Sequence, residues 1–190
     1  MKKVISLSCL LLSSTFAQAD ILGAKAGADY WHTEDQGKAG SAYVQIEHPM
    51  PLLPNAALRA TTIEGAANSE GFNTVDAYGY FEILDNDLVS IDLGAGVHKI
   101  DGSQHFNDTL PMAVADVEWL PGSTFSFYSK LNYAKNNDAT VEDISVGARF
   151  NLLPAIHLQA GYRHYQIDTD NAGGHADTVE GFTAGLHIDI

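Results

Sequence analysis

The feature that most constrains this fold is an apolar–polar alternation with a period of two residues, which recurs along almost the whole chain. In its first occurrence Leu22, Ala24, Ala26, Ala28 and Tyr30 share one face, and glycine or charged residues share the other. Successive side chains of a β-strand point to opposite faces, so this period indicates strands rather than helices. Nine further segments repeat it, which predicts an all-β fold of about ten strands, with eight as the alternative.

The connections between these segments fall into two alternating classes. Short turns run over 84–87, 120–123 and 151–154, and the connection 49–55 is the longest of this class. Longer polar loops run over 32–40, 64–73, 101–109, 134–139 and 168–176. Short turns at one end and long loops at the other are typical of a transmembrane β-barrel. The sequence therefore predicts a closed, antiparallel, up-and-down transmembrane barrel.

The first nineteen residues have the plan of a secretory signal. Lys2 and Lys3 precede an apolar stretch, and Ala17 and Ala19 supply small residues at the cleavage point. Serines interrupt the stretch, which makes it too short and too polar for a membrane-spanning helix. We expect a signal peptide at 1–19, cleavage between Ala19 and Asp20, and one barrel domain at 20–190.

Composition excludes several functional classes. Removal of the signal leaves 8 basic residues against 24 acidic ones in 171 residues, a net charge of −16 that excludes nucleic-acid binding. The only cysteine, Cys9, lies in the signal, so the mature chain forms no disulfide and no thiolate metal site. We expect no cofactor.

Alternation alone does not say which face points outward. A soluble lipocalin-like binder would turn its apolar face inward, whereas a membrane barrel turns it toward lipid. The polar face is rich in glycine, as at Gly94, Gly96 and Gly147, which favours a crowded interior. Aromatic residues of the apolar face gather near the strand ends, which predicts the two girdles of a membrane barrel. They are Phe81, Trp119, Phe125 and Phe150 near the turns, and Tyr30, Tyr133 and Phe182 near the loops.

The polar face carries charges of both signs, which must pair if they are enclosed in a narrow lumen. This favours a salt-bridged interior over a conducting pore. Arg149, His157, His187 and Asp189 should lie together near the turn end. A His/His/Asp group could bind Zn²⁺, but we favour a structural hydrogen-bonded network and assign no metal site.

The long-loop rim offers residue types for hydrolysis but no nucleophile motif. Ser103 and His105 accompany Asp101 in one loop, and His164 precedes Asp168 and Asp170 in another. We assign no catalytic residue. The run 168–173 begins like a calcium loop but lacks the late bidentate carboxylate, which leaves a weak divalent-cation contact to lipopolysaccharide as an alternative to an ordinary loop.

Several short blocks resemble a family of predicted outer-membrane β-barrel proteins from gamma-proteobacteria. The resemblance spans nearly the whole mature chain and implies a barrel, without catalytic residues to carry over. The blocks are Ile46 to Pro51, Leu53 to Asn55, Tyr80 to Asn86, Leu110 to Met112 and Gly161 to Arg163.

We predict an integral protein of the cell outer membrane with a structural or interaction role. Its expected partners are outer-membrane lipid, lipopolysaccharide and, during insertion, the barrel-assembly machinery, and we expect a monomer. The alternatives are a narrow solute channel, a rim-sited lipid or peptide hydrolase, and the lipocalin-like binder.

Overall fold

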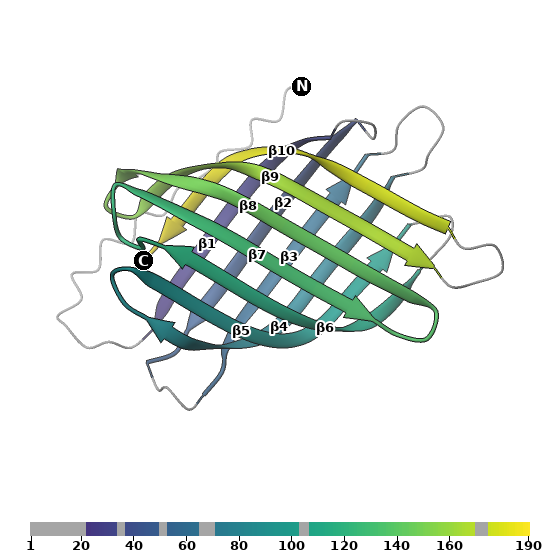
Figure 1. The fold of residues 1–190 in the computed structure, drawn as a ribbon, viewed down its shortest axis with the longest axis horizontal. Helices are drawn as coiled ribbons and strands as arrows, with labels where there is room; N and C mark the ends of the chain where they lie inside the picture. The colour runs from purple at the N-terminus through teal and green to yellow at the C-terminus, as the bar shows by residue number, and fades with distance from the viewer. Residues whose placement is uncertain (1–21, 34–36, 50–52, 65–70, 103–106, 170–174) are drawn as a thin grey trace, which may run out of the picture.

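The computed structural model describes residues 22–33, 37–49, 53–64, 71–102, 107–169 and 175–190. These residues form one closed barrel in which each strand pairs antiparallel with its neighbours in sequence and β1 pairs with β10 (Figure 1). No helix in these ranges is long and apolar enough to cross a membrane. The predicted fold class and strand count are confirmed. The strands are β1 (Gly23–Thr33), β2 (Lys38–Glu47), β3 (Asn55–Ile63), β4 (Phe72–Asp85), β5 (Val89–Asp101), β6 (Asp108–Trp119), β7 (Phe125–Lys135), β8 (Ala139–Leu153), β9 (Ile156–Thr169) and β10 (His175–Asp189).

The two ends of the barrel differ in their connections. At the turn end, β1 and β10 also close against each other, where Ala24 and Ile190 exchange backbone hydrogen bonds of 2.7 and 2.9 Å. At the loop end, the prediction of a long loop over 134–139 is wrong, because only residues 136–138 join β7 to β8. The Asn136 side chain closes this turn by accepting hydrogen bonds from the backbone N–H groups of Asp138 and Ala139, at 2.8 and 2.9 Å.

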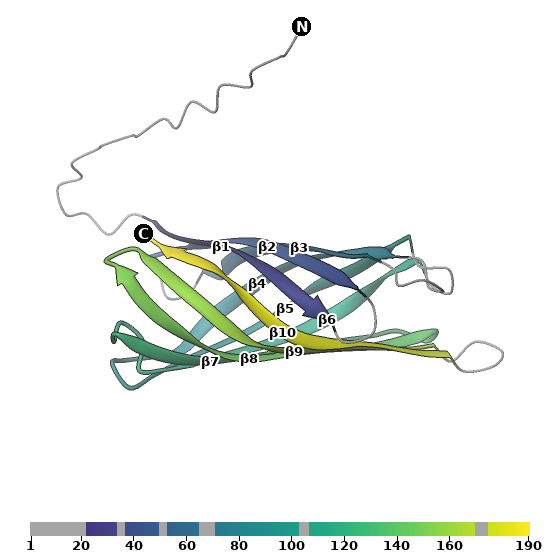
Figure 2. The ribbon, with the colours of Figure 1, turned by 90° about the horizontal axis from the view of Figure 1, so that it is seen from above.

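The barrel wall is uneven in height. β8 and β10 have 15 residues each, whereas β3 has 9 and β2 has 10. Seen from above, the longer strands extend beyond β1 and β2 at the loop end (Figure 2).

The apolar face of the strands points outward. Val44, Leu58, Val146 and Leu186 are each about half exposed, and large hydrophobic side chains like them recur on all ten strands. An apolar surface of this extent marks a protein that contacts lipid or another apolar partner. The inward positions of the turn-end half are polar, which excludes the lipocalin-like alternative.

Glycines on the inner face make room for tyrosines. Tyr43, Tyr78, Tyr80 and Tyr128 each lie directly opposite an inward glycine of the neighbouring strand. A Cβ atom added at Gly27, the partner of Tyr43, would lie 2.5 Å from the Tyr43 ring. The ring therefore occupies the space that a side chain would need, which explains the glycine-rich polar face.

Substitution Gly27→Ala should destabilise the barrel by about 1–3 kcal/mol, because the added methyl overlaps the Tyr43 ring and a packed interior tolerates such overlap poorly. Reversible denaturant unfolding of the barrel in lipid vesicles measures the change. Gly79→Ala is the matched control, since its Cβ would meet nothing nearer than 3.5 Å. In a Tyr43→Ala background the cost of the methyl should vanish. An equal cost in both backgrounds would contradict this packing.

Candidate functional site in the barrel lumen

The loop end of the lumen is filled by an apolar layer. Its side chains come from inward positions close to the loop-end termini of their strands, and all are less than one tenth exposed. Sequence reasoning missed this layer, because alternation fades where both faces of a strand are apolar. The signal was present in the run Leu110 to Val114. The layer consists of Trp31, Ile63, Phe72, Ile100, Leu110, Met112, Val141, Tyr165, Ile167 and Val179.

Below the apolar layer lies a buried ionic layer centred on Arg163 and Asp143. Arg163 donates two hydrogen bonds of 2.7 Å to the two carboxylate oxygens of Asp143, and both side chains are only 2% exposed. The guanidinium also lies over the Trp31 ring, with its central carbon 4.8 Å from the ring centroid. Bidentate geometry of this kind makes a strong pair and fixes both side chains.

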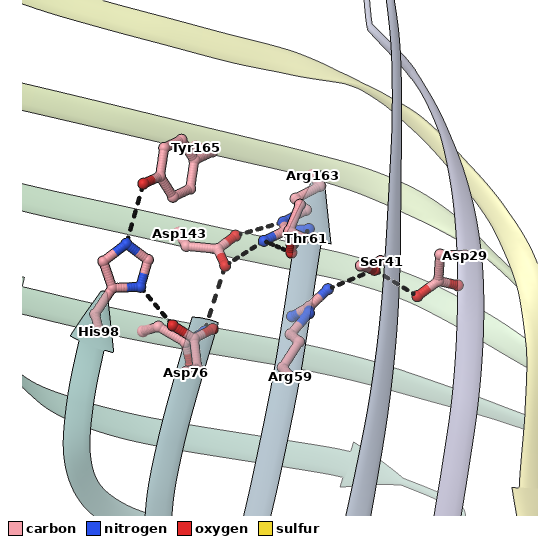
Figure 3. Close-up of polar contacts among 10 residues, drawn as sticks. Asp29, Ser41, Arg59, Thr61, Asp76, His98, Asp143, Arg163 and Tyr165 are labelled. Atoms are coloured by element: carbon pink, nitrogen blue, oxygen red, sulfur yellow. Dashed lines mark hydrogen bonds and ion pairs between the residues drawn. The ribbon is translucent and has the colours of Figure 1, made fainter. Parts of the chain in front are cut away.

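The ionic layer extends in two directions from this pair (Figure 3). On one side His98 bonds to Asp76 through Nδ1 and to the Tyr165 hydroxyl through Nε2, the latter at 3.1 Å. On the other side Arg59 donates to the Ser41 hydroxyl at 3.4 Å, and Ser41 donates to Asp29 at 3.4 Å.

The turn-end half of the lumen holds a polar cavity of about 100 Å³. Lys130 pairs with Asp116 at 2.6 Å on its wall, and Arg149 pairs with Glu118. Arg149 reaches Glu118 by crossing the face of Tyr128, with 4.8 Å between the guanidinium carbon and the ring centroid. Side chains at this end remain partly exposed, whereas those of the ionic layer are buried, so the cavity is reached from the turn end.

The four residues of the predicted network are only partly brought together. His157 and His187 lie with ring centroids 5.4 Å apart. His187 is bonded through Nδ1 to the Tyr43 hydroxyl at 2.6 Å, and Arg149 pairs with Glu118 instead of Asp189. Asp189 lies opposite Lys25 in the β1–β10 register. Among the described residues, no group of three or more His, Cys, Asp or Glu side chains is arranged to hold a metal ion.

The seven predicted girdle aromatics all lie on the outer face and are at least one third exposed. Phe125 packs against Phe150 at the turn end, with ring centroids 4.9 Å apart, and Phe182 meets Tyr162 edge-on at 5.4 Å. The other four are Tyr30, Phe81, Trp119 and Tyr133. Contact of these rings with the membrane interface stays a prediction.

Some predicted positions lie outside the described residues, namely the cleavage site Ala19–Asp20 and the rim candidates Ser103, His105 and Asp170. Within the described part, His164 bonds to Glu180 at 2.9 Å rather than to Asp168. The Asp168 carboxylate accepts a hydrogen bond of 3.0 Å from Gln166. The structure thus joins His164 to an acid that sequence reasoning did not pair with it.

No family model matches the sequence, and no curated protein matches it. Among solved structures, the outer-membrane protease OmpT from Escherichia coli superposes with a TM-score of 0.50 at 9% identity, covering 90% of this chain and 94% of that one. Neisserial surface protein A superposes with a TM-score of 0.40 at 16% identity, covering 89% of this chain and 97% of that one. The KdgM porin superposes with a TM-score of 0.44 at 9% identity, covering 86% of this chain and 99% of that one. The superposition on OmpT shows that the two chains share a fold, and it says nothing of activity. With the apolar outer surface, this fold makes the chain an integral β-barrel of the outer membrane.

Proposed function

We propose that this protein is a closed, non-conducting barrel that serves a structural or interaction role in the outer membrane. The observation that carries this proposal is the pair of stacked layers in the lumen. Trp31 and Leu110 of the apolar layer are no more than 1% exposed, and Arg163 below them is equally buried. An ion that crosses the barrel would have to displace packed apolar side chains and then a bidentate ion pair.

Purified barrel reconstituted into planar bilayers should show no steady single-channel current, because the layers leave no continuous aqueous path. A gel shift between heated and unheated samples confirms in parallel that the reconstituted protein is folded. A general porin in the same lipid serves as the positive control. Regular conductance steps from the folded protein would overturn the proposal in favour of the narrow channel.

The remaining assignments also belong to this proposal. The barrel acts as a monomer, contacts lipid and lipopolysaccharide through its outer surface, uses the barrel-assembly machinery for insertion, and belongs with the gamma-proteobacterial barrels that its sequence blocks resemble. In this proposal the protein has no catalytic role. Turnover of lipid or peptide by the folded protein would contradict it.

A further inference from the structure

The strand β10 continues past the end of β1 at the loop end of the barrel. The pairing of these two strands stops at Thr33 and Gly181, whereas the pairing of β10 with β9 continues to His175 and Thr169. Residues 175–180 therefore have β9 on one side, and no described residue pairs with them on the other side, where β1 has ended (Figure 2). We call this second side of the segment the β10 edge.

Backbone hydrogen bonds at the far end of β10 show which groups point out of the β10 edge. Ile190 exchanges hydrogen bonds with Ala24 of β1, and the Asp189 N–H donates to the Ala155 carbonyl on the β9 side at 3.1 Å. In an antiparallel strand the N–H and C=O of one residue point the same way, and successive residues alternate. Even-numbered residues of β10 therefore face the β1 side, and odd-numbered residues face β9. The residues that present their backbone groups at the β10 edge are Ala176, Thr178 and Glu180.

The β10 edge lies beyond the residues predicted to form the loop-end girdle. Phe182 is the last large apolar side chain on the outer face of β10 toward the loop end. The next outer-face position is Glu180, which bonds to His164 of β9 at 2.9 Å, and the exposed Thr178 follows. Backbone groups that a sheet edge leaves without a neighbouring strand are a template for a further strand. Here they lie where a water-soluble segment can reach them.

Neither this chain nor a second copy of it is suited to pair along the β10 edge. Only residues 34–36 separate Thr33 from Gly37, and the Thr33 hydroxyl donates a hydrogen bond of 2.8 Å to the Gly37 carbonyl. Three residues are too few to pair along 175–180. A second copy would bring the same excess of acidic residues and its own Glu180 to the edge, and like charges repel. The edge is therefore suited to a segment of another protein.

The side chains around the β10 edge define the chemistry of that segment. Residues 164–169 and 175–180 include Asp168, Asp177 and Glu180 but no lysine or arginine. A strand that continues the line of β1 would place outer-face side chains opposite Glu180 and Thr178, and an inner-face side chain opposite the buried Val179. Opposite charges and β-branched pairs on neighbouring strands stabilise a sheet. The matching segment is basic on its outer face and apolar on its inner face.

We propose that the β10 edge binds an extended, basic peptide segment of another protein, which adds as a strand antiparallel to β10 in the line of β1. Strand addition derives its affinity from main-chain hydrogen bonds and its selectivity from alternate side chains. The proposal names a partner class for the interaction role proposed above, and so it rests on that role. It does not depend on the sealed lumen. Conductance in planar bilayers would leave strand addition intact, and failure to bind peptide would leave the non-conducting barrel intact.

Fluorescence anisotropy with the full-length barrel in detergent micelles tests the proposal with two labelled peptides. They are three repeats of Lys-Val and, as the matched acidic probe, three repeats of Glu-Val. The basic peptide should bind at least about tenfold more tightly than the acidic one, because only its charge complements Glu180. Absence of saturable binding of the basic peptide at about 1 mM would overturn the proposal, as would equal affinities for the two peptides.

Methylation of the peptide backbone separates strand addition from a general attraction to an acidic surface. Alternate N–H groups of an added strand point toward β10, and the others point away. Methylating one alternate set in the basic peptide should therefore weaken binding at least about tenfold, and methylating the other set should change the affinity less than about threefold. An equal effect of the two sets would exclude strand addition.

A variant of the barrel tests the same hydrogen bonds from the other side. Thr178→Pro removes an N–H of the β10 edge without removing a hydrogen bond to β9, and proline is tolerated at such positions of an edge strand. This variant should bind the basic peptide at least about tenfold more weakly, whereas Thr178→Val keeps the N–H and should bind like the wild type. Heat-modifiability on gels reports folding, and the methylated peptides carry the test if Thr178→Pro does not fold. Wild-type affinity in folded Thr178→Pro contradicts the proposal.

Amide hydrogen exchange of the free barrel shows whether the β10 edge is open. The Thr178 amide should exchange rapidly without peptide, and saturating basic peptide should slow its exchange at least about tenfold. Slow exchange without peptide that depends on barrel concentration would place a second copy at the edge. Slow exchange that does not depend on concentration would mean that this chain covers its own edge. Either result overturns the proposal.

Discussion

Replacement of Asp143 by asparagine should lower the free energy of unfolding by about 3–5 kcal/mol, because it leaves the buried Arg163 guanidinium without its counter-ion. The two side chains are each 2% exposed, so water cannot take over the lost interaction. Reversible unfolding in denaturant, with the barrel in lipid vesicles, gives the difference. It is the largest effect we expect from a change of one functional group.

Two further variants show whether the loss in Asp143→Asn comes from a buried, unpaired charge. Asp101→Asn removes the same charge from the exposed Lys99–Asp101 pair, whose atoms are 3.9 Å apart, and should cost less than about 1 kcal/mol. The double variant Asp143→Leu with Arg163→Met removes both charges and should recover most of the loss, since apolar residues often replace a buried pair without cost. Equal losses for Asp143→Asn and Asp101→Asn would show that the ionic layer is not buried.

Substitution of Leu131 by arginine should cost about 2 kcal/mol, because Leu131 lies on the outer face within the apolar belt, between Phe127 and Tyr133 on β7. A charged side chain facing lipid loses its hydration, and this loss falls toward zero near the membrane interfaces. The measurement is again unfolding in lipid vesicles.

The matched control is the same substitution at Leu88, in the turn between β4 and β5. Leu88 is 70% exposed and lies at the turn end, beyond the belt, whereas Leu131 is 42% exposed. Leu88→Arg should change stability by less than about 1 kcal/mol. If the two variants lost the same stability, the outer face around Leu131 would not be embedded in lipid.

Much of the architecture could be predicted from the sequence, because a period of two residues directly reports which side chains share a face. The ten strands and the closed barrel followed from this period, and the outward apolar face followed from the inward glycines. The turn at 136–138 was read as a longer loop, because the polar run Asn136 to Asp138 does not show that strand pairing continues to Lys135 and Ala139.

The interior could be predicted only in outline. Pairing of opposite charges in a narrow lumen follows from physical chemistry, but the identity of each partner depends on register and on barrel curvature. Arg149 reaches Glu118 two strands away because Gly147 leaves space for Tyr128 beneath it. The grouping of His157 with Asp189 assumed that neighbours along the strand ends would pair, and the Tyr43 hydroxyl holds His187 instead.

The apolar layer of the lumen also bears on how freely the outer segments of the chain can change. In the non-conducting barrel that we propose, Trp31, Ile100 and Leu110 close the lumen below its loop end, so the permeability barrier does not depend on the segments that join the strands beyond them. Insertions, deletions and sequence drift in those segments would leave the permeability barrier intact.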